Sequence, residues 1–514
     1  MEDIQQSRSS TQVLTSSDLL HYIINFIPLQ WESEHGDLVR CAVVCRAFYD
    51  PAIRILWRTL GTLFPLWHLL APRDAPFPFA AWNDSRLLYL RRVSAANLWD
   101  DSTRWARFLW HASHIRNLNF VADPIFPEAN DIQLRLLRSV IIKNGGNTVL
   151  PLLHSISWSQ DVAAMLRDST LSPLFSPTLR YAIIYLGDSH TLANVTSLSR
   201  LRESSPFLEV ITLSIDSDAG VDLPLARELA SFDRLHEIRL PSLAEPQVFQ
   251  ELISRPNLAT LSLFEVVGPW VGPAQGVSVR HLLELDICSN IPSVISLFEH
   301  TRFEVLRTVR LSCVRSDTHC RIADMIPVLE AARGAIFPGS LQSLTIFSGW
   351  FSPLEEKLSL RAVLAPVLSF PSIRFFSFFC PVDVVRHEDE DIDAIARAWP
   401  HLERLSLYSG ILIDPAVSIV ALHHLYARCS RLQEVFLSRL CCPAIGVHAM
   451  PPPQLDRVTS HSLRKLFIGE IVSPHATTEE AVEGLLRYFL DLFPCLEDRA
   501  VETRSGPLRI ASTS

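Results

Sequence analysis

The sequence predicts an α/β protein in which a short N-terminal group of three helices precedes an irregular solenoid. Three observations lead to this prediction. A short aliphatic motif recurs along most of the 514 residues, helix-like segments separate its copies, and about sixty N-terminal residues show amphipathic patterns without the motif. In such a solenoid we expect parallel strands on the concave face and helices on the convex face.

The recurring motif reads aliphatic, two residues, aliphatic, one residue, aliphatic, as in "LEVITL" and "LERLSL". Its first residues in the ten clear copies are Leu208, Leu235, Leu258, Leu282, Leu306, Leu341, Ile373, Leu402, Leu432 and Leu463. Weaker copies are "HIRNLNF" and "TLRYAIIYL" upstream, and "PCLEDRAV" at the end. The copies begin 23 to 35 residues apart, which is the length that one strand and one helix require. Apolar and polar residues alternate in the second half of each copy, as in a strand with one buried face.

Helical patterns lie between these strands. "AVSIVALHHLYARCS" aligns four apolar side chains on one stripe: Val417, Val420, Ala421 and Leu425. "DEDIDAIARAW" starts with acids, as a helix N-terminus prefers, and then aligns Ile392, Ile395, Ala396 and Trp399. Its acidic stretch, residues 387–393, lacks the glycine turn of a calcium loop, so we expect a solvated helix start.

A single repeat unit cannot be stable alone. Burying three aliphatic side chains contributes roughly 5–8 kcal/mol, whereas ordering about seven strand residues costs roughly 7–14 kcal/mol. Neighbouring units must therefore cover one another. A doubly wound α/β domain is the alternative, but it calls for a Gly-rich turn after an early strand, and none is present.

The strand–helix period resembles leucine-rich repeats over roughly residues 111–500. Regular members of that family carry an asparagine three residues after the third aliphatic residue, which ties neighbouring loops together. The copy "LLELDICSN" has it, at Asn290, whereas the preceding copies carry Asp216, Leu243 and Val266 at this position. We therefore expect a solenoid of irregular curvature and repeat length.

The N-terminal residues predict three helices. The first follows Ser16 or Ser17 and has one apolar face: Leu19, Leu20, Ile23, Ile24 and Ile27. The second is expected over residues 36–49, with a stripe of Leu38, Cys41, Cys45 and Phe48. The third is expected to start at Asp50-Pro51 and to align Ile53, Leu56, Trp57 and Leu60. So small a module needs a partner or a neighbouring domain to complete its core.

A helix that begins with "DLL", followed by "LVRCAVVCRAFYDPAIRILWRTL", resembles the F-box of fungal F-box proteins over residues 13–60. The resemblance implies docking on a Skp-type adaptor and, through it, on a cullin-based ubiquitin ligase, while the repeats recruit a protein substrate. The adaptor-binding candidates it implies are Leu14, Leu19, Leu20, Ile23, Ile24, Cys45, Phe48, Leu56 and Trp57. The family typically has a proline after the first leucine, whereas Thr15 follows Leu14 here.

The predicted organisation has five parts. Residues 1–12 form a disordered N-terminus, 13–60 the F-box-like module, 61–110 a Pro- and Trp-rich connector packed on the repeats, 111–500 the solenoid and 501–514 a flexible tail. The net charge of −9 and the lack of a polybasic run argue against nucleic-acid binding. Because no long uncharged apolar run and no signal-peptide pattern is present, we expect a cytoplasmic or nuclear protein that does not enter a membrane.

Candidate chemistry is sparse. Cys41, Cys45 and His35 suggest half of a metal site, but no second ligand pair is recognisable, so we expect the cysteines to lie in a helix core and expect no metal or cofactor. No catalytic motif is visible, and the sequence predicts a non-enzymatic receptor. The rival hypotheses are a repeat scaffold without ligase association and an enzyme with an unrecognised site. The substrate-binding residues are not predicted, although specificity could lie at outward strand positions such as Glu237, Arg239, Glu403, Arg404 and Ser406.

Overall fold

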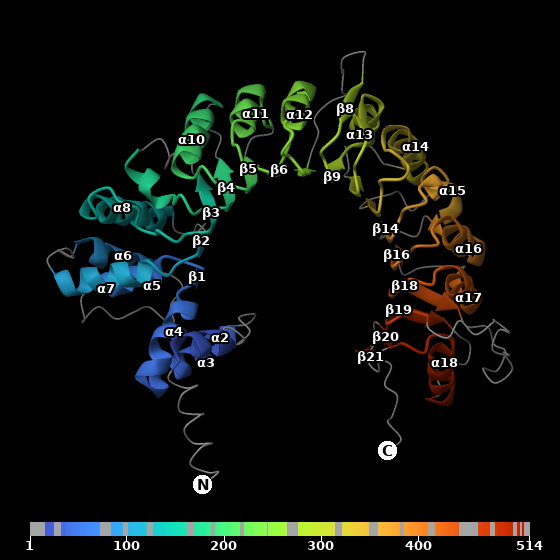
Figure 1. Cartoon of the computed structure of the whole chain (residues 1–514), viewed down its shortest axis with the longest axis horizontal. Helices are drawn as coiled ribbons and strands as arrows, with labels where there is room; N and C mark the ends of the chain where they lie inside the picture. The colour runs from blue at the N-terminus through green and yellow to red at the C-terminus, as the bar shows by residue number, and fades with distance from the viewer. Residues whose placement is uncertain are drawn as a thin grey trace, which may run out of the picture. The chain divides into compact units, whose positions relative to one another are not determined.

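In the computed structural model, strands and helices alternate along most of the chain (Figure 1). The residues that it describes are 16–24, 32–71, 84–95, 101–120, 127–161, 169–186, 191–215, 220–243, 245–264, 276–313, 321–348, 358–380, 385–409, 417–441, 461–472, 479–496, 501–503 and 506–507. The chain divides into two compact units. Unit 1 spans Met1–Asp218 and Pro224–Ile238, and unit 2 spans Ala219–Leu223 and Arg239–Ser514.

Unit 1 starts with three helices and continues with strands that alternate with helices. Its helices are α2 (Ser17–Ile24), α3 (Glu32–Val44), α4 (Arg46–Leu56), α5 (Phe64–Leu70), α6 (Asp84–Ala95), α7 (Ser102–Ala112), α8 (Pro127–Lys143) and α10 (Thr191–Ser204), with the 3-10 helix η1 (Ser169–Leu174). Its strands are β1 (Thr59–Leu60), β2 (Asn117–Phe120), β3 (Ser155–Asp161), β4 (Tyr181–Leu186) and β5 (Val210–Ile215). They pair in this order and all in parallel. Helix α11 (Leu223–Ala230) and strand β6 (Glu237–Leu240) contain the points at which the chain passes between the units.

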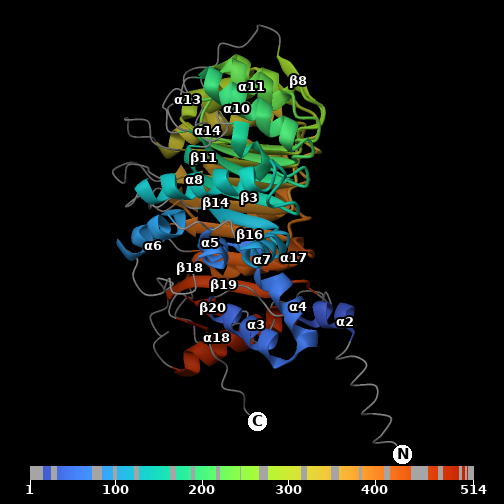
Figure 2. The ribbon, with the colours of Figure 1, turned by 90° about the vertical axis from the view of Figure 1, so that its left-hand side faces the viewer.

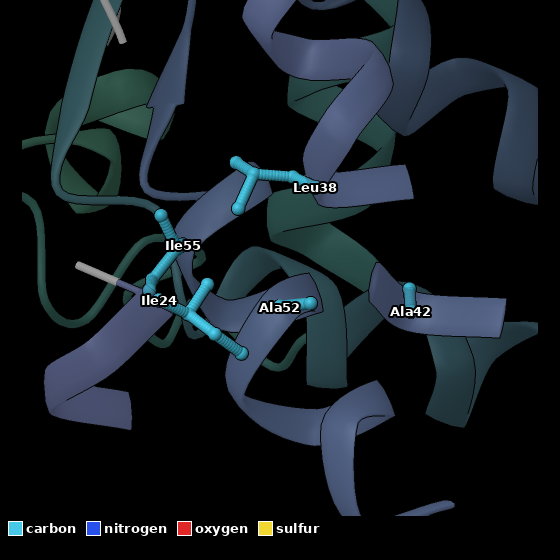
Figure 3. Close-up of a cluster of buried hydrophobic side chains, with 5 residues drawn as sticks. All are labelled: Ile24, Leu38, Ala42, Ala52 and Ile55. Carbon is cyan, nitrogen blue, oxygen red and sulfur yellow. The ribbon is translucent and has the colours of Figure 1, made fainter. Parts of the chain in front are cut away.

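The N-terminal helices enclose a small core of their own. Figure 3 shows its five buried residues, which come from all three helices: Ile24, Leu38, Ala42, Ala52 and Ile55. Cys41, Phe48, Ile53 and Leu56 pack against this cluster and are half-buried. Three short helices therefore form one module, as the apolar stripes predict.

The helix boundaries within the module differ from those predicted. The helix expected over residues 36–49 is broken at Cys45, whose extended backbone (φ −161°) precedes α4. Asp50-Pro51 consequently lies inside α4 and does not start a helix. The carbonyl of Cys45 accepts hydrogen bonds from the amides of Phe48 and Tyr49, at 3.1 and 3.2 Å, and thereby begins α4. The third helix also ends earlier than expected, because Leu60 is a buried residue of β1.

The module continues directly into the first strand of unit 1. The carbonyl of Arg58 accepts hydrogen bonds from the amides of Arg116 and Asn117, each at 2.9 Å, and β1 then pairs with β2. Much of the segment expected as a connector, residues 61–110, forms the helices α5, α6 and α7. The strand order of unit 1 thus begins at Thr59, before the segment where the sequence predicts the repeats to start.

Unit 2 continues the alternation of strands and helices. The strands that pair in parallel are, in order, β7 (Thr260–Leu263), β9 (Glu284–Ser289), β11 (Thr308–Cys313), β12 (Ser343–Ser348), β14 (Phe375–Cys380), β16 (Arg404–Ser409), β18 (Glu434–Cys441), β19 (Lys465–Val472) and β20 (Val501–Thr503). The helices are α12 (Pro246–Ile253), α13 (Ile291–Glu299), α14 (Met325–Ala335), α15 (Leu360–Leu364), α16 (Asp389–Ala398), α17 (Ile419–Arg428) and α18 (Glu479–Leu492). Figure 2 shows β14, β16, β18, β19 and β20 as successive neighbours.

Shorter elements complete unit 2. They are the strands β8 (Val277–Val279), β10 (Thr301–Phe303), β13 (Leu358–Ser359), β15 (Val385–Arg386), β17 (Val417–Ser418) and β21 (Gly506–Pro507), and the 3-10 helices η2 (Ile322–Asp324) and η3 (Val367–Ser369). Strand β21 pairs antiparallel with β20, whereas the other pairs formed by these strands are parallel. Strands lie about 4.8 Å apart whereas packed helices need about 10 Å, so stacking bends each unit with its strands on the inner side.

The predicted repeat motif is confirmed. In the ten clear copies, every one of the three motif positions is at most 2% exposed. Strand–helix repeats with this buried pattern and parallel pairing make the fold leucine-rich-repeat-like. Strand β3 is a copy that the sequence pattern missed, because "LHSISW" places a tryptophan, Trp158, at the third buried position, where the motif calls for an aliphatic residue.

One detail of the repeats corrects the sequence prediction, and a second shows the role of Asn290. Val420 is 41% exposed, so the buried stripe of α17 is formed instead by Ile419, Ala421, Leu422, Leu425 and Tyr426. The side chain of Asn290 caps its own helix by accepting a hydrogen bond from the Ser293 amide at 3.0 Å. An asparagine ladder between loops is therefore not its role.

The acidic start of α16 ties neighbouring repeats together. Asp391 is 2% exposed, and its carboxylate accepts hydrogen bonds from the amides of Arg361 and Glu388, at 2.9 and 2.8 Å. Asp389 accepts from the amide of Ser418 in the next repeat at 2.8 Å. Burial raises the pKa of Asp391, and the two backbone hydrogen bonds oppose that rise. The helix start expected to be solvated is thus partly structural.

Candidate protein-binding surfaces

Helix α2 presents apolar side chains on both of its faces. Leu20 and Ile24, one turn apart, are each 1% exposed, and Ile24 belongs to the buried cluster of the module. Leu19, Tyr22 and Ile23 point the other way and are 46%, 64% and 49% exposed. Apolar side chains gathered on an exposed helix face make this face a candidate surface for contact with another protein.

Helices α3 and α4 add further exposed apolar residues. Val39, Val43 and Val44 of α3 are 48%, 78% and 69% exposed, and Tyr49 of α4 is 44% exposed. Leu38 and Ala42, which precede Val39 and Val43 by one residue, are buried. We call Leu19, Tyr22, Ile23, Val39, Val43, Val44 and Tyr49 the exposed apolar set of the module.

The structure separates the predicted adaptor-binding residues into several environments. Leu19 and Ile23 are exposed, whereas Leu20 and Ile24 belong to the core. Cys45, directly before α4, is exposed, and Phe48 and Leu56 are half-buried against the core. Trp57 lies at the end of α4, and Leu14 lies outside the described residues. The sequence prediction misses most of the exposed apolar residues, because it follows the stripe of Leu38, Cys41, Cys45 and Phe48 and leaves out the valines between them. The signal that could have found two of them is the valine that directly follows a buried residue of α3, Val39 after Leu38 and Val43 after Ala42.

Trp57 joins the module to the rest of unit 1. Its ring lies 4.3 Å from the ring of His111 in α7, measured between centroids. His111 is 3% exposed, and burial, with a smaller effect of Arg107, lowers its pKa to about 4. The imidazole is therefore neutral at physiological pH and packs as an aromatic ring. This contact, together with the pairing of β1 with β2, fixes the module on the first repeats.

Unit 2 has a second surface of interest, on the face of its strands that points away from the buried core. We call this the outward strand face. Five aromatic rings follow one another across five neighbouring strands: Phe347, Phe379, Tyr408, Phe436 and Phe467. The centroid distances along this series are 4.6, 4.3, 6.1 and 4.5 Å. Phe347 is 41% exposed and the other four rings are half-buried. We call these five residues the aromatic row.

Charged side chains accompany the aromatic row where the strands begin. Arg374 forms an ion pair with Glu403, and Glu434 lies between Arg404, at 2.6 Å, and Lys465, at 3.4 Å. Two of the outward positions singled out from the sequence, Glu403 and Arg404, therefore take part in these pairs. The pairs link successive repeats, but exposed ion pairs stabilise a fold by only about 0–1 kcal/mol each.

Among the residues that the structure describes, we identify no group of side chains typical of a catalytic site. No group of three or more His, Cys, Asp or Glu side chains there could hold a metal ion. Cys41 packs on the module core whereas Cys45 is exposed, so the two thiols do not share an environment. Burial lowers the pKa values of His387 and His461 to about 4, which leaves both as neutral residues of the repeat core. None of the described helices has the length and apolar character needed to cross a lipid bilayer.

Comparison with known proteins gives remote similarities. No protein-family model and no curated protein sequence matches the chain. Among solved structures, the leucine-rich-repeat-containing protein LegL7 from Legionella pneumophila is similar, with 12% identity, a TM-score of 0.30 and 68% of this chain and 92% of that chain covered. A chain of the Rad7 and Elc1 complex in yeast has 13% identity, a TM-score of 0.29 and coverage of 70% and 90%. A leucine-rich-repeat protein from Leptospira interrogans has 13% identity, a TM-score of 0.31 and coverage of 77% and 98%.

Proposed function

We propose that this chain is the substrate-recognition subunit of a Skp/cullin/F-box-type ubiquitin ligase. The N-terminal module binds a Skp-type adaptor and the repeats bind a protein substrate. The observation that carries the proposal is the exposed apolar set of the module, on three short helices at the position where the sequence resembles an F-box. Burying these side chains against an adaptor contributes favourable free energy in proportion to the apolar area covered.

The proposed division of labour assigns no chemistry to this chain. Holding substrate and adaptor together raises the local concentration of the substrate beside the other ligase subunits. The contact between Trp57 and His111 and the pairing of β1 with β2 support this role, because they couple the module firmly to the repeats of unit 1. A firm coupling lets the adaptor-bound module hold those repeats at a set position.

Co-elution on a sizing column tests the adaptor contact. The purified full chain is mixed with a purified Skp-type adaptor and compared with the double variant L19D/I23D, in which two exposed residues become charged. Ile142→Asp is the matched control, because Ile142 is an apolar residue of α8 that is 68% exposed. We expect the double variant to lose affinity by roughly 30-fold or more while the control binds as wild type does.

Two results would contradict the proposal. Absence of a complex with the wild-type chain would remove the ligase role and favour a repeat scaffold that binds proteins without a ligase. The residue after Leu14 is the observation that favours this second function, since Thr15 stands where the F-box family usually has proline. Unchanged binding by L19D/I23D would instead show that the adaptor contacts another surface.

A further inference from the structure

The aromatic row offers ring edges to a ligand, whereas most ring faces are covered. Phe347, Phe379 and Tyr408 stack with interplanar angles of 6° and 8°, and Phe436 and Phe467 stack at 7°. The edge of an aromatic ring carries partial positive charge and prefers the face of another ring or an acidic group. Stacked faces are also closed to nucleotide bases, which bind single-stranded nucleic-acid sites by stacking on open rings.

A row of small hydroxyl side chains lies beside the stacked rings. Thr345, Ser377 and Ser406 pair in register on β12, β14 and β16 and are half-buried. On β14, Ser377 stands between Phe375 and Phe379 on the same face of the strand. Hydroxyl groups both donate and accept hydrogen bonds, so this row can bind the amides and carbonyls of a polypeptide that crosses the strands.

The strand starts beside the aromatic row carry an excess of positive charge. From β11 to β19, the cations at the last position before each strand and at its first position are Arg307, Arg374, Arg404, Arg464 and Lys465. The acids at the same positions are Glu403 and Glu434. Five cations against two acids contrast with the net charge of −9 of the whole chain. This local charge is complementary to an acidic ligand.

From these three features we infer that the outward strand face of unit 2 binds an extended, acidic polypeptide segment with aromatic or proline side chains. Those apolar side chains would contact the ring edges, its backbone the hydroxyl row and its carboxylates the cations. This inference rests on the proposed function, because it names the class of substrate that the repeats recruit. It adds the segment's chemistry and the strands, β11 to β19, that recognise it.

Selection from a random library tests the inference without a known substrate. A phage-displayed library of 12-residue peptides is selected on the immobilised full chain, and the enriched peptides are measured by fluorescence anisotropy. The variants are F379S/Y408S, which removes two neighbouring rings of the aromatic row, and R404E, which reverses the charge at one strand start. Matched controls are F264S, at a residue of unit 2 that is 59% exposed, and R333E, at an exposed residue of α14. Melting curves establish that each variant is folded.

We expect the enriched peptides to combine Asp or Glu with aromatic residues or proline. F379S/Y408S should weaken their binding by about 30-fold or more. R404E should weaken it by about tenfold at low salt and less at high salt. A failure to enrich acidic aromatic or proline-containing peptides, or equal binding by the variants and the controls, would overturn the inference. Tighter binding of a 20-nucleotide single-stranded oligonucleotide at the same residues would overturn it in favour of nucleic acid.

The selection does not depend on the adaptor, so the two proposals can fail separately. Peptide binding without adaptor binding refutes the ligase role and leaves the aromatic row as a peptide site. Adaptor binding without peptide enrichment refutes the aromatic row and leaves the module contact intact.

Discussion

Leu19 and Leu20 are adjacent in α2 but are expected to respond oppositely to truncation. Leu20 is 1% exposed and Leu19 is 46% exposed. Leu20→Ala should release α2 from the module, whereas Leu19→Ala should leave α2 in place and weaken adaptor binding. The pair thus separates residues that hold the module together from residues that face a partner.

The expected size of the effect follows from burial. Replacing a fully buried leucine by alanine costs about 2–5 kcal/mol, whereas most exposed positions change stability by about 0.5 kcal/mol or less. Among the described residues of α2, only Leu20 and Ile24 are buried. A helix of 8 residues is not stable alone, so the loss of one of two anchors should open it. An opening cost reduced by about 2 kcal/mol accelerates amide exchange about 30-fold.

Hydrogen exchange followed by mass spectrometry measures this opening in the intact chain. We expect peptides from α2 to exchange at least about 30-fold faster in Leu20→Ala and within about threefold of wild type in Leu19→Ala. Peptides from unit 2 serve as the internal control and should not change. Equal acceleration by both variants, or no acceleration by Leu20→Ala, would refute the assignment of the two leucines.

Three further predictions concern the repeats and the thiols. Gly469→Ala should destabilise the chain by about 1–3 kcal/mol, because a Cβ would stand 2.5 Å from a carbonyl oxygen of β18. A Cβ at Gly334 in α14 would meet no atom within 4 Å, so Gly334→Ala should stabilise the chain by about 0.5–1 kcal/mol. Thermal melting compares the two variants with the wild-type chain. His387, like His111 and His461, has a pKa of about 4 when folded and 6.5 when unfolded, so the unfolded chain binds more protons between these values. The contribution of His387 to stability should therefore fall by about 3 kcal/mol as pH drops from 6.5 to 4. His387→Phe should flatten this dependence in denaturant titrations, and an unchanged slope would count against the buried neutral ring. Maleimide should label the exposed Cys45 in the native chain. Cys429 is buried and its pKa is raised to about 12, so maleimide should label it only after unfolding. Peptide mapping identifies the labelled cysteines.

The repeat architecture could be predicted from sequence because its signal is periodic and its cause is burial. Every clear copy of the motif places its three positions in the core, as at Leu402, Leu405 and Leu407. Where a bulky residue replaces an aliphatic one, as Trp158 does in β3, the pattern fails although the strand forms. Pairing with neighbours on both sides stabilises such a strand even when its own sequence is ambiguous.

The module was harder to predict, because helix boundaries depend on tertiary packing. The stripe that includes Cys45 and Phe48 fits one continuous helix, yet the chain turns at Cys45 so that α4 packs beside α3. The pattern also could not separate Leu19 from Leu20, since both belong to one apolar run. Which of them faces the core depends on where α4 lies.

The aromatic row was not predictable from single copies of the motif. Phe379 and Tyr408 stand 29 positions apart in sequence and come together because β14 and β16 pair in register. The motif defines only the inward positions, whereas the outward ones acquire meaning from their neighbours on adjacent strands. Aligning the copies by their buried residues would have revealed Phe347, Phe379 and Tyr408 in one column and Phe436 and Phe467 in another, but not that β16 and β18 bring the two groups together.

Site-specific photo-crosslinking tests the central claim most directly. A benzophenone amino acid replaces Val43, which is 78% exposed on α3, or Phe379 of the aromatic row, and the purified full chain is irradiated with a Skp-type adaptor. If the module is the adaptor-binding part, the adaptor crosslinks from position 43 and not from position 379. Crosslinking from position 379 alone, or from neither position, would contradict the proposed division between a module that binds the adaptor and repeats that bind the substrate.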